Sequence, residues 1–368
     1  MPHAGGDAVL EVVGLSVRFR TGDRVLTAAD DVSFAIAPGE TLALLGESGS
    51  GKSVAARAVM GLLAGREVDV EATRLALGGT DLLGLPADQR RALRGSRMTL
   101  VFQDALSALN PVLRVGDQIG ELFRVHERTS RRVARSRSVD LLRRVGIPAP
   151  DSRVDNYPHQ FSGGMRQRLL VAMAIALQPP LLIADEPTTA LDVTVQAQVL
   201  ELLAELCGEM GTAVLLITHD MGIVAEVADR VAVMYAGRIV ETAPVEDIFA
   251  APGHPYTEAL LRSVPRIDRP AAELHPIAGT PPSPLALPSG CAFRPRCGYA
   301  VGVCADVRPD LAPVGGPDVR MSACHRREDV GSADVTDSAG VTGRADVTDS
   351  AGVTGGADQL EGSGCGEP

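Results

Sequence analysis

Apolar residues follow two different spacings along the first part of the chain. At residues 9–19 and 32–37 they alternate with polar residues, which is the period of a half-buried β-strand, and turn residues separate the runs. A continuous apolar run at residues 41–45 then leads through a glycine-rich loop into residues 52–63, which we expect to be helical. Strand, glycine loop and helix in this order form half of a phosphate-binding βαβ unit.

The middle of the chain, about residues 104–180, is predicted to be mainly helical. Its Arg-rich stretch places Val133, Leu141, Leu142 and Val145 on one helical face, so we expect the arginines to form a solvated surface. A patch that faces phospholipid is the alternative.

Three further apolar runs, at residues 181–187, 213–220 and 231–240, are separated by helical segments. This alternation predicts a mostly parallel sheet that is covered on both faces. We expect the sheet to end near Ala250, because Pro and Gly become dense beyond it and indicate a loop-rich appendage.

The end of the chain differs in composition from the rest. Residues 331–368 hold seven acids against one arginine, which accounts for −6 of the net charge of −11, and the stretch ADVTDSAGVTG occurs at 333–343 and again at 345–355. Such a stretch cannot bury a core, so we predict a disordered acidic repeat tail. A short β-repeat module is the alternative, although such modules usually need at least three copies.

Composition excludes several classes of protein. Aromatic residues make up only 3% and Trp is absent, which argues against a base-stacking nucleic-acid surface. The N-terminus has no basic region followed by an apolar stretch, so no signal peptide is expected. The longest uncharged run, residues 169–184, is shorter than the roughly 20 residues of a membrane span.

The strongest motif is GESGSGKS, which matches the phosphate-binding pattern GxxxxGK[ST] between the predicted strand and helix. Backbone N–H groups of such a loop surround a triphosphate, helped by the helix dipole. Lys52 is expected to reach the β- and γ-phosphates and Ser53 to bind Mg²⁺. The predicted nucleotide-binding residues of the loop are Gly46, Glu47, Ser48, Gly49, Ser50, Gly51, Lys52 and Ser53.

Two further motifs carry nucleotide chemistry. In LLIADEP, Asp185 suits the Mg²⁺ shell, and Glu186 can orient or deprotonate an attacking water. In FSGGMRQR, Ser162, Gly163 and Gly164 open a helix and could form a second phosphate-binding N-terminus. Taken alone, the latter pattern is better explained by a serine cap followed by flexible glycines.

Together, GESGSGKS, VFQD, FSGGMRQR, LLIADEP, TALD and ITHD resemble, in this order, the nucleotide-binding subunit of an ATP-binding cassette transporter. The resemblance implies an α/β fold, a P-loop NTPase cassette over residues 8–255. Its parts are a RecA-like core, an N-terminal antiparallel β-subdomain and a helical subdomain at about 104–180. It also implies a head-to-tail dimer in which each ATP lies between the Walker loop of one subunit and the Ser-Gly-Gly stretch of the other.

The same resemblance assigns roles to further residues. Phe19 would stack on adenine, Gln103 would contact Mg²⁺ and signal toward membrane subunits, Asp192 would report across the dimer, and His219 would hold the γ-phosphate beside the catalytic Glu186. Three of these residues also have ordinary explanations: Phe19 as a core aromatic, Gln103 as a loop amide and His219 as a capping residue.

The signature stretch departs from the family pattern. Phe161 precedes Ser162, and Met165 replaces the usual glutamine of the trans signature. Because Ser162 and the two glycines make the phosphate contacts, we expect activity to survive this change.

The segments GHPYTEALL and GCAFRPRC, with the later SACH, resemble the ATPase subunits of oligopeptide, dipeptide and nickel importers. This implies a C-terminal extension at 256–330 and an ATPase that energises solute uptake at the cytoplasmic face of a bacterial inner membrane. Its partners would be a second ATPase subunit, identical or paralogous, two transmembrane permease subunits and an extracytoplasmic solute-binding protein, but no nucleic acid. Import of nickel or another small solute, or a soluble cassette ATPase without transport, are the alternatives.

Four cysteines lie in the extension, spaced C-x5-C-x6-C-x19-C: Cys291, Cys297, Cys304 and Cys324. They lack the close pairs of most zinc sites, and related importer subunits carry a [4Fe–4S] cluster here, so we expect that cluster, with Zn²⁺ or unliganded thiols as alternatives. Cys207 is expected to be a buried apolar residue, and Cys365 lies in the tail. We expect replacement of Cys297 by Ser to leave ATP affinity nearly unchanged, since the Walker loop would belong to a separately cored cassette.

Overall fold

A computed structural model describes residues 8–22, 24–63, 65, 67–102, 108–187, 193–263, 277–315 and 320–330 of the chain. These residues all belong to one compact unit, Met1–Ala333. The predicted tail lies outside the described residues. Within them, no helix has both the length and the apolar character that crossing a membrane requires.

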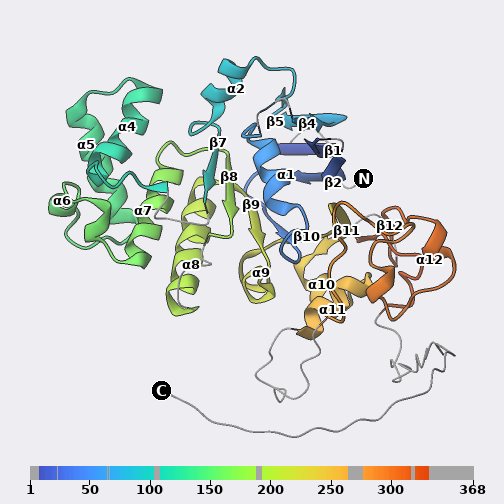
Figure 1. Ribbon diagram of the computed structural model, residues 1–368. Helices are drawn as coiled ribbons and strands as arrows, with labels where there is room; N and C mark the ends of the chain where they lie inside the picture. Colours follow the sequence, from blue (N-terminus) through green and yellow to red (C-terminus); the bar gives the residue numbers. More distant parts are fainter. Residues whose placement is uncertain are drawn as a thin grey trace, which may run out of the picture. The chain divides into compact units, whose positions relative to one another are not determined.

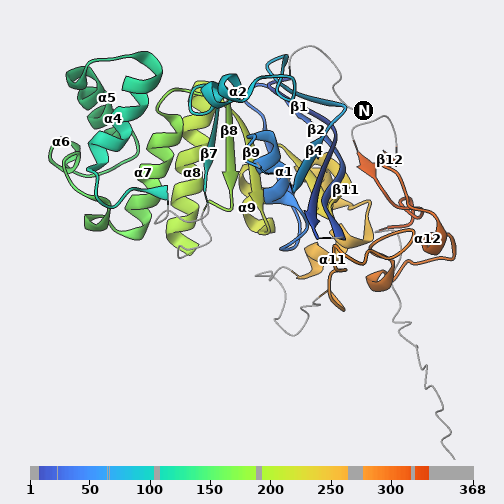
Figure 2. The ribbon, with the colours of Figure 1, turned by 45° about the horizontal axis from the view of Figure 1, so that its top comes forward.

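The N-terminal sheet is antiparallel, as predicted for the β-subdomain. Its strand order is β2-β1-β5-β6, and β4 also pairs with β1. Figure 2 labels β1, β2 and β4 of this sheet. The strands are β1 (Leu10–Thr21), β2 (Arg24–Ile36), β4 (Val68–Glu71), β5 (Arg74–Leu77) and β6 (Thr80–Asp81).

The central sheet has the order β12-β13-β11-β10-β3-β9-β8-β7. Figure 1 labels β7, β8 and β9 on one side of it and β10, β11 and β12 on the other. Its parallel strands are β10 (Arg230–Tyr235), β3 (Thr41–Leu45), β9 (Ala213–Thr218), β8 (Leu181–Asp185) and β7 (Met98–Val101). Helix α1 (Lys52–Val59) follows β3, α8 (Val193–Met210) connects β8 with β9, and α9 (Met221–Val227) connects β9 with β10. Because β3, β9 and β8 are neighbours, the loops that follow them lie at one edge of the sheet.

The expectation that the sheet ends near Ala250 is wrong. After β11 (Arg238–Pro244), two short strands of the extension, β12 (Ala312–Pro313) and β13 (Met321–Ser322), add to the sheet next to β11. Each strand has only two residues, so neither leaves an apolar run in the sequence. The pairing depends on backbone hydrogen bonds, which residue type alone does not reveal.

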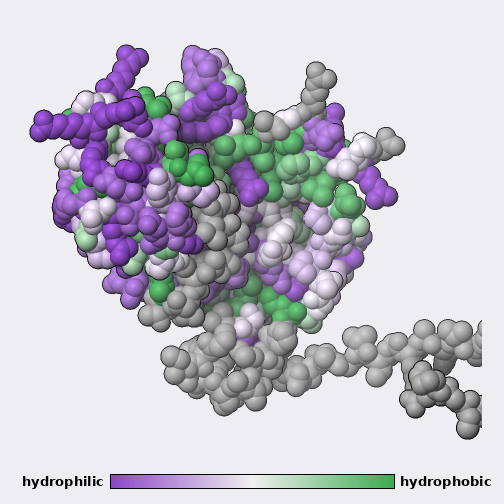
Figure 3. Space-filling model, turned by 60° about the vertical axis from the view of Figure 1, so that its left-hand side comes forward, coloured by the Kyte–Doolittle hydropathy of each residue, from purple (hydrophilic) through white to green (hydrophobic). Residues whose placement is uncertain are grey.

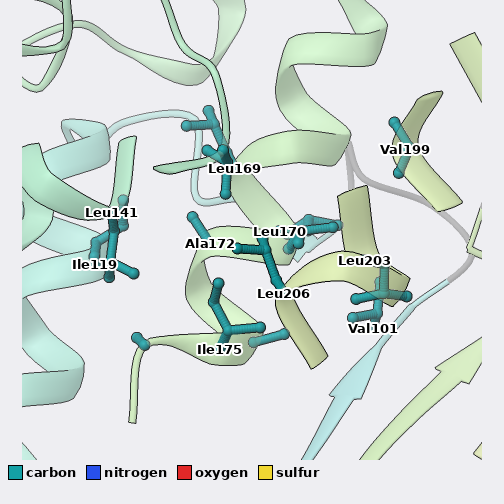
Figure 4. Close-up of a cluster of buried hydrophobic side chains, with 14 of the residues drawn as sticks. Val101, Ile119, Leu141, Leu169, Leu170, Ala172, Ile175, Val199, Leu203 and Leu206 are labelled. Carbon is teal, nitrogen blue, oxygen red and sulfur yellow. The ribbon is translucent and has the colours of Figure 1, made fainter. Parts of the chain in front are cut away.

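The helical part comprises α4 (Val115–Glu127), α5 (Arg131–Arg144), α6 (Pro150–Arg153) and α7 (Gly163–Ile175), with α2 (Ala87–Leu93) and the 3-10 turn η1 (Pro158–Gln160) nearby in sequence. Apolar side chains of α4, α5, α7, α8 and β7 form one core cluster (Figure 4). Ile119, Leu141, Leu169 and Leu206 are among its members, so the helical part packs against the central sheet.

The arginines of α5 lie on a solvated surface, as predicted. Four of them pair with acids, and Figure 3 shows that this side of the molecule is mainly hydrophilic. The pairs are Arg135–Asp155, Arg137–Glu127, Arg143–Asp140 and Arg144–Glu209. One detail of the prediction is wrong: Val133 is 47% exposed, and the buried face of α5 carries Ala134 and Ser138 before Leu141 and Leu142.

The extension and the central sheet share a core. Helix α10 (Val245–Ala250) precedes the extension, whose helices are α11 (Pro255–Ser263), η3 (Arg294–Arg296) and α12 (Val303–Asp306). Leu45 and Val233 of the sheet belong to the same buried cluster as Tyr256, Leu260 and Phe293. The extension therefore packs on a cluster that it shares with the sheet, while the two other buried clusters contain, among the described residues, no buried side chain of the extension.

The shared core predicts a single unfolding transition. Phe293 is 2% exposed, and its ring lies 5.3 Å from that of Tyr235 and 5.4 Å from that of Tyr256. Phe293→Ala should lower the free energy of unfolding by about 3–5 kcal/mol, since it leaves a cavity among buried aromatic rings. Thermal unfolding followed by circular dichroism should show one transition at lower temperature.

Leu285→Ala is the matched control, because this leucine also belongs to the extension but is 52% exposed. Its unfolding temperature should stay close to that of the wild type. Two separate transitions, of which only a minor one moves in Phe293→Ala, would contradict the shared core.

Candidate nucleotide-binding site

The loop between β3 and α1 depends on two glycines. Gly46 has φ 155° and Gly51 has φ 104°, and a Cβ atom on either would lie 2.2 Å from a backbone oxygen, that of Met234 or of Ala28. The neighbouring backbone leaves no room for a side chain at these two positions. The sequence motif therefore reflects close packing as well as loop conformation.

Lys52 begins α1 and points back to the loop. Its side chain is buried, and Nζ donates hydrogen bonds to the carbonyl oxygens of Gly46 (2.7 Å) and Glu47 (2.9 Å). Burial lowers the pKa of Lys52, while the nearby Glu186, Asp185 and Glu47 act in the opposite direction. An ammonium group thus lies inside the loop, where it can meet phosphate oxygens.

Ser53 and Asp185 come together although they are 132 residues apart. The Ser53 hydroxyl donates to Asp185 Oδ1 at 2.7 Å. Asp185 ends β8 and is buried, and this burial raises its pKa, while the hydrogen bond from Ser53 opposes the rise. A hydroxyl and a carboxylate are hard oxygen donors of the kind that Mg²⁺ binds, so these residues fit the ion that the motifs imply.

Glu186 and His219 meet at the ends of β8 and β9. Glu186 Oε1 lies 3.3 Å from His219 Nδ1, and the Glu186 N–H donates to the Ile217 carbonyl at 2.9 Å. Glu186 has φ 47°, a left-handed conformation that costs energy in a residue with a side chain. The surrounding strands hold it there, which aims the carboxylate at the loop edge.

A cavity of about 330 Å³ lies over the phosphate-binding loop. Besides the loop and Glu186, it is lined by parts of β2, by the turn after β10 and by the extension. The lining residues outside the loop and α1 are Leu26, Thr27, Ala28, Glu186, Tyr235, Ala236, Gly237, Pro281, Pro282, Pro284 and Leu287.

Phe19 does not line this cavity. It lies on β1 opposite Leu26 and packs against the core of the N-terminal sheet. Stacking of Phe19 on adenine stays a prediction.

The Ser-Gly-Gly stretch opens α7 as predicted. Ser162 caps the helix, its Oγ accepting from the Met165 N–H at 3.4 Å, and Ser162 and Gly163 are exposed. Gly164 faces Val195, whose Cγ1 would lie 2.6 Å from an added Cβ. None of these residues lines the cavity over the chain's own phosphate-binding loop. Gln103 and Asp192 lie outside the described residues.

Two residues of the extension contact the loop and were not predicted. The Glu47 N–H donates to the Tyr256 hydroxyl at 2.8 Å, and Arg296 forms two bonds with the Glu47 carboxylate, at 2.7 Å and 3.0 Å. Both residues lie in quoted segments, GHPYTEALL and GCAFRPRC, but nothing in those segments points to residue 47. Only the fold brings them together across more than 200 positions.

The four cysteines of the extension gather in space. The Cys291 N–H donates to the Cys304 carbonyl at 2.9 Å. Burial raises the pKa of Cys297 to about 12, and that of Cys324 to about 11, and neighbouring thiols of the group contribute in the same direction. No disulfide links them.

The predicted metal centre has no support in this arrangement. Among the residues that the structure describes, no group of three or more His, Cys, Asp or Glu side chains could hold a metal ion. Cys207 is 2% exposed and burial raises its pKa to about 12, in agreement with its predicted packing role.

Comparison with known families matches both parts of the chain. A family model described as ABC transporter matches residues 29–189, and one described as the C-terminal region of oligopeptide/dipeptide transporters matches residues 240–304. The second match begins within the central sheet and ends at the third of the four cysteines.

Known proteins are similar over most of the chain. A putative peptide import ATP-binding protein of Brucella melitensis is 50% identical over 317 residues, which cover 83% of this chain and 94% of that protein. The dipeptide transport ATP-binding protein DppD of Bacillus subtilis is 50% identical over 303 residues, covering 82% and 90%.

Solved structures are similar over the cassette. A dimeric ATP-binding cassette in a post-hydrolysis state with ADP and Pi has a TM-score of 0.56 and 25% identity, covering 64% of this chain and 98% of that one. The protein cbiO1 of Clostridium perfringens, part of an ABC transporter complex, has a TM-score of 0.57 and 28% identity, covering 66% and 91%.

Proposed function

The chain belongs to the ATP-binding cassette transporter family, and from this membership we propose that it hydrolyses ATP to energise the uptake of dipeptides or oligopeptides. The observation that carries the proposal is the convergence of Lys52, Ser53, Asp185, Glu186 and His219 at one edge of the central sheet. The relatives named for peptide import and dipeptide transport support the class of solute.

Each side chain has a place in the hydrolysis of ATP. Lys52 and the N–H groups of the loop bind the β- and γ-phosphates, while Ser53 and Asp185 would hold Mg²⁺, which neutralises phosphate charge when bound. Glu186 accepts a proton as water attacks the γ-phosphate. His219, 3.3 Å from that carboxylate, is placed to contact the same phosphate.

We further propose that the enzyme works as a head-to-tail dimer. Ser162 and Gly163 are exposed at the start of α7 and are absent from the lining of the chain's own cavity, so a second subunit can receive them. Gln103, through Mg²⁺ and toward the permeases, and Asp192, across the dimer, keep their proposed roles. The dimer mate is identical or paralogous.

We place the dimer on the cytoplasmic face of a bacterial inner membrane, bound to two permease subunits that receive solute from an extracytoplasmic binding protein. The match to the C-terminal region of oligopeptide/dipeptide transporters supports these partners. Nickel or another small solute is the second candidate cargo. Co-purification of the chain with the permeases is the direct test. If the chain were a soluble ATPase without a transport role, neither permease would co-purify with it.

Replacement of the proposed base tests the hydrolysis mechanism. Glu186→Gln keeps the shape of the side chain but removes its basicity, so steady-state hydrolysis should fall by about 10²–10⁴-fold. ATP binding should remain, because Lys52 and Ser53 are untouched. Phosphate release and equilibrium ATP binding are the two measurements.

Glu201→Gln, an exposed position on α8, is the control and should hydrolyse ATP like the wild type. Wild-type turnover in Glu186→Gln would show that another group activates the water.

A charge at the start of α7 tests the composite site. Gly163→Asp places a carboxylate where the partner's γ-phosphate would lie, so ATP-driven dimerisation should be lost while each monomer still binds nucleotide. Size-exclusion chromatography with light scattering, in the Glu186→Gln background with ATP, measures this. Gly163→Ala is the uncharged control, and normal dimerisation of Gly163→Asp would rule out the composite site.

We also propose that Cys291, Cys297, Cys304 and Cys324 hold a [4Fe–4S] cluster. The grounds are the four cysteines in a loop-rich segment of the sequence and the resemblance to importer subunits that carry such a cluster here, since no metal-binding group is found among the described residues. Protein purified without oxygen should be brown and contain about four irons per chain. Cys297→Ser should bleach it and make residues near 280–325 sensitive to protease, because metal binding contributes to folding.

Cys207→Ser, in a buried site on α8, is the control and should keep the colour. Colourless protein with one zinc ion per chain would show a zinc site in place of the cluster. Metal-free protein with four titratable thiols would show that the cysteines are unliganded.

A further inference from the structure

Two groups of Glu47, which lies inside the phosphate-binding loop, bond to the extension: its carboxylate to Arg296 and its backbone N–H to Tyr256. Arg296 Nη1 and Nη2 donate to the two carboxylate oxygens at 2.7 Å and 3.0 Å, and the arginine side chain is only 4% exposed. The Tyr256 hydroxyl accepts from the Glu47 N–H at 2.8 Å. A paired fork of this kind fixes both the position and the plane of the carboxylate.

Arg296 is itself fixed by its surroundings. Its Nε donates to the Ala278 carbonyl at 2.9 Å, and its guanidinium lies 5.9 Å from the ring centres of Tyr235 and Phe293. Tyr235 belongs to the central sheet and Phe293 to the core that the extension shares with it. Because these contacts fix Arg296 against the shared core, its bonds to Glu47 also hold the loop in position.

The charge of Glu47 makes the pairing important for an anionic ligand. Glu47 lies close enough to Lys52 to act on its pKa, and the same loop is expected to receive the triphosphate. An unpaired carboxylate there would repel the phosphates, and at a partly buried site the repulsion would be weakly screened. The Arg296 guanidinium neutralises it.

The extension also forms one wall of the cavity. Pro281, Pro282, Pro284 and Leu287 line it together with residues of the loop. The bond from Arg296 to Ala278 anchors the start of this proline segment. One arginine therefore connects the wall of the cavity with its floor.

We propose that the C-terminal extension is a working part of the nucleotide site, in which Arg296 is a positioning residue: it neutralises and orients Glu47, so that ATP affinity depends on the extension. This inference rests on the proposed function, since it assigns a further residue to the same ATP site. The expectation that replacement of Cys297 leaves ATP affinity nearly unchanged stays a prediction; the inference concerns Arg296, the residue directly before it.

The test measures binding of a fluorescent ATP analogue with Mg²⁺ to the full chain. Arg296→Ala should raise Kd on the order of 10-fold, because it leaves the Glu47 carboxylate unpaired beside the phosphates. Arg296→Ala/Glu47→Gln should recover most of the affinity, since the repelling charge is gone. In steady-state assays Arg296→Ala should raise KM more than it lowers kcat, and Arg296→Lys should fall between wild type and alanine.

Arg308→Ala is the matched control. Arg308 also joins the extension to the cassette, through an ion pair with Asp30 at 2.8 Å, but neither residue lines the cavity. Its Kd should stay within about two-fold of the wild type, as for an exposed ion pair.

Three results would overturn the inference. Wild-type affinity in a folded Arg296→Ala protein would remove its role, and a double variant as weak as the single one would show that the arginine only supports the fold. If Arg296→Ala does not fold, Arg296→Lys decides, and wild-type affinity there would exclude the forked contact. If the wild-type chain did not bind the analogue, that result would instead contradict the proposed function itself.

Discussion

Parallel pairing of β3, β9 and β8 is the constraint on which the rest of the site depends. Leu45 pairs with Thr218, and Asp185 with Ile217, so the three strands end at nearly the same level. The phosphate-binding loop, Glu186 and His219 follow these strand ends directly, and Asp185 is the last residue of β8. Since the strands are buried on both faces, a slip of one residue would turn apolar side chains the wrong way and also separate the site residues.

The strained backbone of Glu186 and the burial of Asp185 both depend on neighbouring elements of the fold. Glu186 keeps a left-handed backbone because its N–H is bonded to Ile217 of the neighbouring strand, and Asp185 stays buried because Ser53 supplies a hydrogen bond. Both conditions are unfavourable for an isolated turn. The sheet makes them possible, which is how a rigid scaffold prepares groups for chemistry.

The extension is an integral part of this scaffold, because it adds strands to the sheet and shares a buried cluster with it. Its strands β12 and β13 lengthen the sheet, and its aromatic residues Tyr256 and Phe293 pack on Tyr235 beside the loop. Residues of the extension thereby form a second layer of contacts around the phosphate-binding loop, outside the strand ends. The proline segment at 281–284 and Arg296 belong to that layer.

The amino-acid sequence by itself determined the α/β class, the phosphate-binding loop, the acidic pair at the end of β8 and the capped start of α7. These features are local: a glycine pattern, a buried run or a serine before a helix expresses its physical role within a few residues. Tertiary structure alone decided that Ser53 meets Asp185, that Arg296 and Tyr256 hold Glu47, and that the extension shares the core. Such contacts join residues 132 to 249 positions apart, and they depend on which strands pair and which faces pack, a choice that no short segment encodes.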